Sequence, residues 1–107
     1  MPNVLKNPPD GLFVTNDFVP KHVNANATST NIKTGPGLLR TVTVNTKGAS
    51  GNALTLYDDI GTGTNNVIAV IDTTAAVGSL LFDSQFSNGL NYALAAGTAA
   101  DVTISYR

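Results

Sequence analysis

The chain has 107 residues, of which 42% are hydrophobic, so it is long enough to bury one core and too short for two. Only 12% of the residues are charged and the formal net charge is −1, with lysine and arginine scattered, which argues against nucleic-acid binding. The absence of cysteine excludes disulfides and thiolate metal sites.

The first segment, residues 1–30, differs in composition from the rest of the chain. It holds four of the five prolines and few apolar residues, and it lacks the apolar core of a signal peptide. We therefore expect a protein that is made in the cytoplasm, with no segment that crosses a membrane. The segment predicts an extended N-terminal arm, and a disordered terminus is the alternative. The apolar residues that favour a packed arm are Leu12, Phe13, Phe18 and Val19.

Residues 31–107 predict one domain built from β-strands. Apolar and polar residues alternate along short segments that are separated by turns rich in glycine, asparagine and serine. No stretch has a convincing helical period, and only residues 72–78 would accommodate a helical turn. This pattern predicts an all-β fold, an antiparallel β-sandwich or barrel. The expected strands are residues 32–34, 38–46, 53–59, 67–71, 79–83, 90–94 and 102–106.

The stretch from residue 38 to residue 59 predicts a β-hairpin. Two alternating runs flank residues 46–52, whose glycines allow the backbone to reverse. A further run, residues 67–71, is apolar without interruption, which predicts a strand covered on both faces. The side chains expected in the core of the hairpin are Val42, Val44, Leu54 and Leu56.

The opposite faces of these strands carry small, uncharged side chains. They include Thr41, Thr43, Thr55 and Tyr57 in the predicted hairpin. Such a face is either a solvated sheet or an interface between subunits, and the low charge of the chain favours the interface. Tyr57 is also the one aromatic residue that the pattern places outward, which is little support for a sugar-binding site.

Two groups of polar residues could carry chemistry. Asp58 and Asp59 precede a loop of glycine, threonine and asparagine, which could hold a hard cation or could cap a strand end through turn amides. His22, the single histidine, lies in the predicted arm with no nucleophile beside it. We favour the structural interpretation of both and expect no catalytic residue, no bound metal and no cofactor.

Several short motifs between residues 32 and 107 form a recognisable pattern. They are GPGLL (35–39), Val42 with VN (44–45), GASG (48–51), LTLYD (54–58), IDT (71–73), FSNGL (86–90) and GTAADVTISY (97–106). Together they resemble small virion proteins of tailed bacteriophages, encoded near the major capsid protein. The nearest likeness is to capsid decoration, or cement, proteins.

The resemblance implies a structural protein with a jelly-roll-like sandwich, usually trimeric, on the exterior of the capsid. Its partners would be its own copies and the major capsid protein, and it would stabilise the phage head without a cofactor or an enzymatic activity. The alternative is a head-fibre or tail module that binds a glycan or receptor on the host surface. The residues expected at capsid or subunit contacts are Leu12, Phe13, Phe18, Val19, Thr41, Thr43 and Tyr57.

Overall fold

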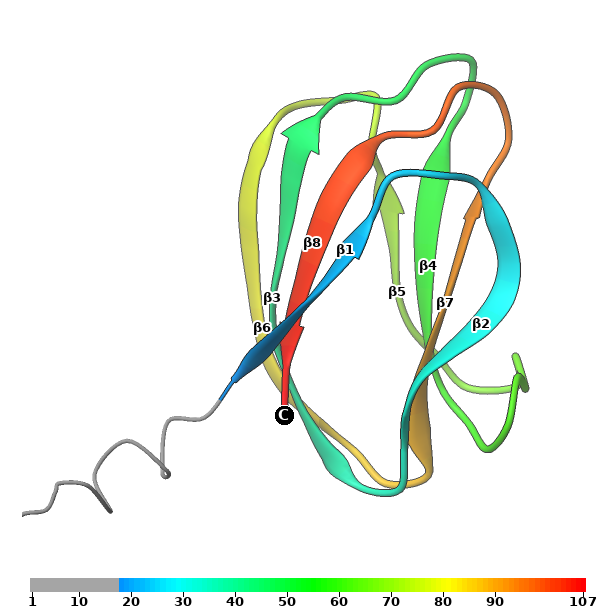
Figure 1. Ribbon diagram of the computed structural model, residues 1–107, viewed down its shortest axis with the longest axis vertical. Helices are drawn as coiled ribbons and strands as arrows, with labels where there is room; N and C mark the ends of the chain where they lie inside the picture. Colours follow the sequence, from blue (N-terminus) through cyan, green and yellow to red (C-terminus); the bar gives the residue numbers. More distant parts are fainter. Residues whose placement is uncertain (1–17) are drawn as a thin grey trace, which may run out of the picture.

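A computed structural model describes residues 18–107, which form eight strands and no helix (Figure 1). The strands make two four-stranded antiparallel sheets, one ordered β1-β8-β3-β6 and the other β2-β7-β4-β5. The predicted all-β antiparallel sandwich is confirmed. The strand bounds are β1 Val19–Val23, β2 Ala27–Thr34, β3 Gly37–Thr46, β4 Ala53–Asp58, β5 Val67–Asp72, β6 Gly78–Phe86, β7 Gly89–Ala95 and β8 Asp101–Tyr106.

The order of the strands is that of a jelly roll. Every connection except the one between β4 and β5 passes from one sheet to the other. Strands that follow one another in the chain, such as β7 and β8, therefore occupy matching positions in the two sheets. The sandwich consequently has β1 and β2 along one side and β5 and β6 along the other.

The predicted hairpin at residues 38–59 is wrong. β3 pairs with β6 and β8, whereas β4 pairs with β5 and β7 in the opposite sheet. Alternation along a strand determines which face is buried, but it does not specify the neighbouring strand. Residues 47–52 are enough to cross the roughly 10 Å between packed sheets instead of closing a tight turn.

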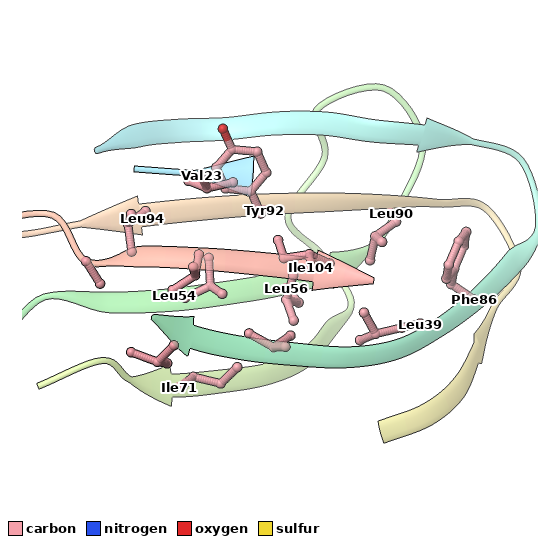
Figure 2. Packing of buried hydrophobic residues seen from close by; sticks show 14 residues of the cluster. Val23, Leu39, Leu54, Leu56, Ile71, Phe86, Leu90, Tyr92, Leu94 and Ile104 are labelled. Carbon is pink, nitrogen blue, oxygen red and sulfur yellow. The ribbon is translucent and has the colours of Figure 1, made fainter. Parts of the chain in front are cut away.

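The core lies between the two sheets (Figure 2). All four side chains predicted for the core of residues 38–59 are buried, with Val42, Leu54 and Leu56 inaccessible to solvent and Val44 nearly so. The buried hydrophobic side chains of β7 and β8 follow the same two-residue period. The buried hydrophobic residues of those strands are Leu90, Tyr92, Leu94, Val102 and Ile104.

Residues 19–30 were predicted to belong to the N-terminal arm, but in the structure they are part of the sandwich. β1 pairs with β8 from Val19 to Val23, and β2 pairs with β7. Val23 is buried, and Ala27 and Ile32 pack against the core. Because proline is rare within strands, Pro20 argued against a strand at the position of β1. Proline is tolerated on an edge strand such as β1, where its missing N–H group is not needed for pairing.

β5 also differs from its prediction. Its apolar run indicated a strand covered on both faces, but β5 lies at the edge of its sheet. Ile71 points into the core and is buried, whereas 56% of Val67 and 66% of Val70 are exposed. A continuous apolar run is typical of a doubly covered strand, and within residues 18–107 nothing covers the outer face of this one.

Candidate functional site

The residues predicted at contacts fall into separate regions of the molecule. Leu12 and Phe13 lie outside the described residues. Thr41 and Thr43 are half-buried on the outer face of β3, and Tyr57 is half-buried on the outer face of β4. Because β3 and β4 belong to opposite sheets, these outer faces point away from each other. The structure therefore does not bring Tyr57 together with the two threonines.

Phe18, the first described residue, contacts two arginine side chains through its ring. The centre of its ring lies 5.2 Å from the guanidinium carbon of Arg40 and 5.1 Å from that of Arg107. Nε of Arg40 in turn lies 3.3 Å from a carboxylate oxygen of Asp83. This Phe18 cluster joins the start of β1 to β3, to β6 and to the end of β8, so it fixes the place where residues 1–17 join the domain.

An irregularity in the pairing of β3 with β6 lies at this cluster. Thr41 pairs with Leu81 and Leu39 pairs with Ser84, so residues 82–83 of β6 face the single residue Arg40. Asp83 adopts a φ of 47°, which is uncommon for a residue other than glycine and typical of a β-bulge. The sequence signal was a break in the alternation at residues 38–41, and it did not identify the partner strand.

A hollow of about 650 Å³ lies beside the Phe18 cluster and shares Arg107 with it. Its walls come from the β2–β3 turn, the β6–β7 turn and the last residue of the chain. Two of the lining residues, Lys33 and Arg107, are cationic and none is acidic, so the hollow suits a polar or anionic group of a partner. The lining residues are Lys33, Pro36, Gly37, Leu38, Gln85, Phe86, Ser87 and Arg107.

The adjacent carboxylates of Asp58 and Asp59 act as turn caps. Asp58 accepts hydrogen bonds from the backbone N–H groups of Ser87, Asn88 and Gly89, at 3.0, 2.9 and 3.4 Å. Burial raises the pKa of Asp58, but the three backbone bonds outweigh it, so the pKa is lowered overall.

Asp59 accepts bonds from the backbone N–H groups of Asn65, at 2.9 Å, and Ile60, at 2.8 Å, and these two bonds lower its pKa. Within residues 18–107 no three His, Cys, Asp or Glu side chains gather as they would around a metal ion.

His22 forms a pair that the sequence did not predict. It lies on β1 rather than in an arm, and its Nε2 is 2.7 Å from Oδ1 of Asp101 on the neighbouring strand. Asn45 donates a further bond of 3.0 Å to the same oxygen. The bonds from Asn45 and then from His22 lower the pKa of Asp101.

The His22–Asp101 pair lacks the third member of a catalytic triad. Among the described residues no serine or threonine hydroxyl bonds to the imidazole, and 56% of the His22 side chain is exposed. The pair is therefore suited to holding β1 against β8 at the edge of the sheet.

Comparison with known proteins shows a shared fold but no family for this chain. No protein-family model matches the chain, and no curated protein matches it. Among solved structures it is similar to the Drosophila NLP-core, whose crystal structure concerns pentamer formation and histone binding.

That likeness has a TM-score of 0.56 and 12% sequence identity, and it covers 85% of this chain and 96% of the NLP-core chain. At this identity it shows a shared fold alone. In the part of the chain that the structure describes, no helix is long and apolar enough to span a membrane.

Proposed function

We propose that this chain is a structural virion protein that decorates the capsid of a tailed bacteriophage and stabilises the phage head. It binds the major capsid protein on the exterior of the capsid, as a homo-oligomer and by our expectation a trimer. The motifs of residues 32–107 support the proposal, together with a sandwich whose outer faces carry small, uncharged threonines such as Thr41, Thr43 and Thr55. Such faces lose little free energy when they are desolvated against a partner.

The observation that carries the proposal furthest is the fixed starting point of the N-terminal segment. Phe18 forms cation–π contacts with Arg40 and Arg107, at the end of the sandwich where β1 starts and the chain terminates (Figure 1). Seventeen residues span at most about 60 Å when fully extended. A segment of that reach, attached at a defined place, suits a protein that contacts capsid subunits around it.

Oligomerisation would make the attachment tight. Each arm and each sandwich rim contributes a weak contact, and linking several of them raises the overall affinity by orders of magnitude without new contacts. The cationic hollow beside the Phe18 cluster offers such a rim contact, because Lys33 and Arg107 line it.

The histone binding of the NLP-core is not proposed for this chain. Histones are basic, and an acidic surface would be needed to attract them. The net charge here is −1, and each of the five aspartates within residues 18–107 already bonds to a partner in the chain. Those five residues are Asp58, Asp59, Asp72, Asp83 and Asp101.

Co-sedimentation tests the proposal. The purified full chain is mixed with capsids built from the major capsid protein of the same phage. The fraction of the chain that sediments with the capsids is measured as a function of its concentration. We expect saturable binding by the full chain and background binding by a variant that lacks residues 1–17, which keeps β1 intact.

The Lys47→Gln variant is the control, because Lys47 is exposed and lies outside the strands. A truncated protein that still saturates capsids would show that the arm is not needed. Absence of capsid binding together with a signal on a glycan array would favour the head-fibre or tail module instead.

A further inference from the structure

The four sheet edges of the sandwich are protected unequally. On one side, β1 carries Pro20 and Lys21, and β2 has two register irregularities and Lys33. Proline, lysine and irregular pairing are features that keep an open strand from pairing with another chain. On the other side, β5 has one register irregularity, at Ile68, and neither β5 nor the first half of β6 contains proline or lysine in its sequence, VIAV and GSLL.

The less protected side is also the apolar side. Exposed fractions are 66% for Val70, 60% for Val77 and 66% for Leu81, and Val67 and Leu80 are exposed by about half. We call these five residues the β5–β6 patch. Val70 extends the outer face of one sheet beside Thr55, and Leu81 extends that of the other sheet beside Thr41.

A small hollow opens between the two edges. It measures about 190 Å³ and lies under residues 73–77, which connect β5 to β6 over one end of the sandwich (Figure 1). Its walls include Val44 and Ile71 from the core as well as Val77 and Leu80 from the patch. The apolar interior of the sandwich is therefore continuous with the patch at this point.

The patch carries no net attraction for a charged partner. Asp72 is the only charged residue between positions 60 and 82, and Thr74 donates to its carboxylate from both its backbone and its hydroxyl group. Asp83, just beyond, is paired with Arg40. A partner for this surface must therefore be neutral and apolar and must bring a surface of similar shape.

We propose that copies of this chain meet patch against patch at the β5–β6 side. A contact between this patch and the β1–β2 side of a second copy would bury Lys21 and Lys33 against uncharged groups, which is costly. A contact between the β5–β6 patches of two copies instead places valine and leucine side chains against other valine and leucine side chains. It also removes the open edges of β5 and β6 from solvent. The arrangement suits two copies around a twofold axis or three around a threefold axis.

This inference rests on the oligomerisation in the proposed function and names the surface that carries it. Mass in solution, measured by light scattering, tests it with two charge-introducing substitutions made together, Val70→Asp and Leu81→Asp. We expect a discrete oligomer for the unmodified chain and a monomer for the double variant at the same concentration. Thr28→Asp, an exposed position on β2, is the matched control and should keep the oligomer.

Cysteine cross-linking gives a second measurement that does not depend on the double variant folding. The natural chain has no cysteine, so Leu81→Cys and Thr28→Cys each introduce a single thiol. We expect covalent dimers under mild oxidation from Leu81→Cys and only monomer from Thr28→Cys. A monomeric or polydisperse unmodified chain, or a double variant with unchanged mass, would overturn the inference.

Different results would contradict the proposed capsid decoration and the proposed contact between β5–β6 patches. A chain that is monomeric in solution but still saturates capsids would contradict the patch contact and support the proposed capsid decoration. An oligomer that cross-links through Leu81→Cys but does not bind capsids would confirm the patch contact and contradict the proposed capsid decoration. A monomeric double variant that binds capsids at least tenfold more weakly than the unmodified chain would support both.

Discussion

The hydroxyl group of Thr73 donates a hydrogen bond of 2.6 Å to the side-chain oxygen of Asn52, and both residues are inaccessible to solvent. The same oxygen accepts a bond of 3.1 Å from the backbone N–H of Ala100. The amide nitrogen of Asn52 donates to Asn26 and to the carbonyl of Ala96, each at 2.9 Å. One buried side chain thus joins four connections between strands at one end of the sandwich.

Replacing Asn52 with alanine should destabilise the fold by about 2 kcal/mol or more, because several buried polar groups lose their partner. Urea unfolding followed by circular dichroism measures the change, since the chain has no tryptophan to report by fluorescence. Asn66→Ala, at an exposed position, should shift the free energy of unfolding by no more than about 0.5 kcal/mol. Equal losses in the two variants would contradict a structural role for this network.

Asp58→Asn should weaken the fold by about 1 kcal/mol at pH 7, because an amide is a poorer acceptor for three backbone N–H groups than a carboxylate. The pKa of Asp58 is lower in the folded chain than in the unfolded chain. Its contribution is therefore complete above the unfolded pKa and is lost as the pH falls through the folded pKa.

The difference between the natural chain and Asp58→Asn should accordingly shrink below about pH 4. Free energies of unfolding at pH 7, 4 and 3 give the measurement, with Lys47→Gln as a charge-changing control at an exposed loop position. A difference that stayed constant across this range would show that the bonds to Asp58 do not depend on its ionisation.

The core was predictable because burial follows a local period. Val42, Val44, Leu54 and Leu56 each lie two positions from another inward residue, and this spacing identifies a buried face without knowledge of the partner strand. Pairing is not local, so the same residues wrongly indicated a hairpin. β1 escaped prediction because only Val23 of its five residues is buried.

The site was less predictable than the core. Phe18 and Val19 stood out as apolar residues in a polar segment, but nothing in the sequence indicated that Arg40 and Arg107 would contact the Phe18 ring. Arg40 lies opposite the bulge at Asp83, which is set by the pairing of distant strands. The exposure of Val70 was equally hidden, because an apolar run does not show whether the chain's own strands or another molecule will cover it.

Phe18→Ala should loosen the start of β1. Loss of the ring and of its contacts with two guanidinium groups removes about 1 kcal/mol, which corresponds to roughly a fivefold rise in the open population. Trypsin cleaves after lysine, and Lys21 lies within β1, so the initial rate of cleavage there should rise by about that factor. Phe18→Tyr keeps an aromatic ring and should match the natural chain, whereas Phe18→Leu should resemble alanine; a leucine variant as resistant as the natural chain would show that bulk alone holds the strand.

Gly37→Ala should destabilise the chain by about 2 kcal/mol for a steric reason. Gly37 packs against the ring of Phe86 and the backbone carbonyl oxygen of Arg107, so an added methyl group has no room unless β3 moves away from β8. The neighbouring Gly35 presents the opposite case, with a φ of 87° and open space around it. Gly35→Asn should therefore cost less than about 1 kcal/mol, since asparagine tolerates the left-handed conformation. Urea unfolding of both variants tests the contrast, and a larger loss at Gly35 than at Gly37 would mean that backbone conformation, not close packing, governs this end of the sandwich.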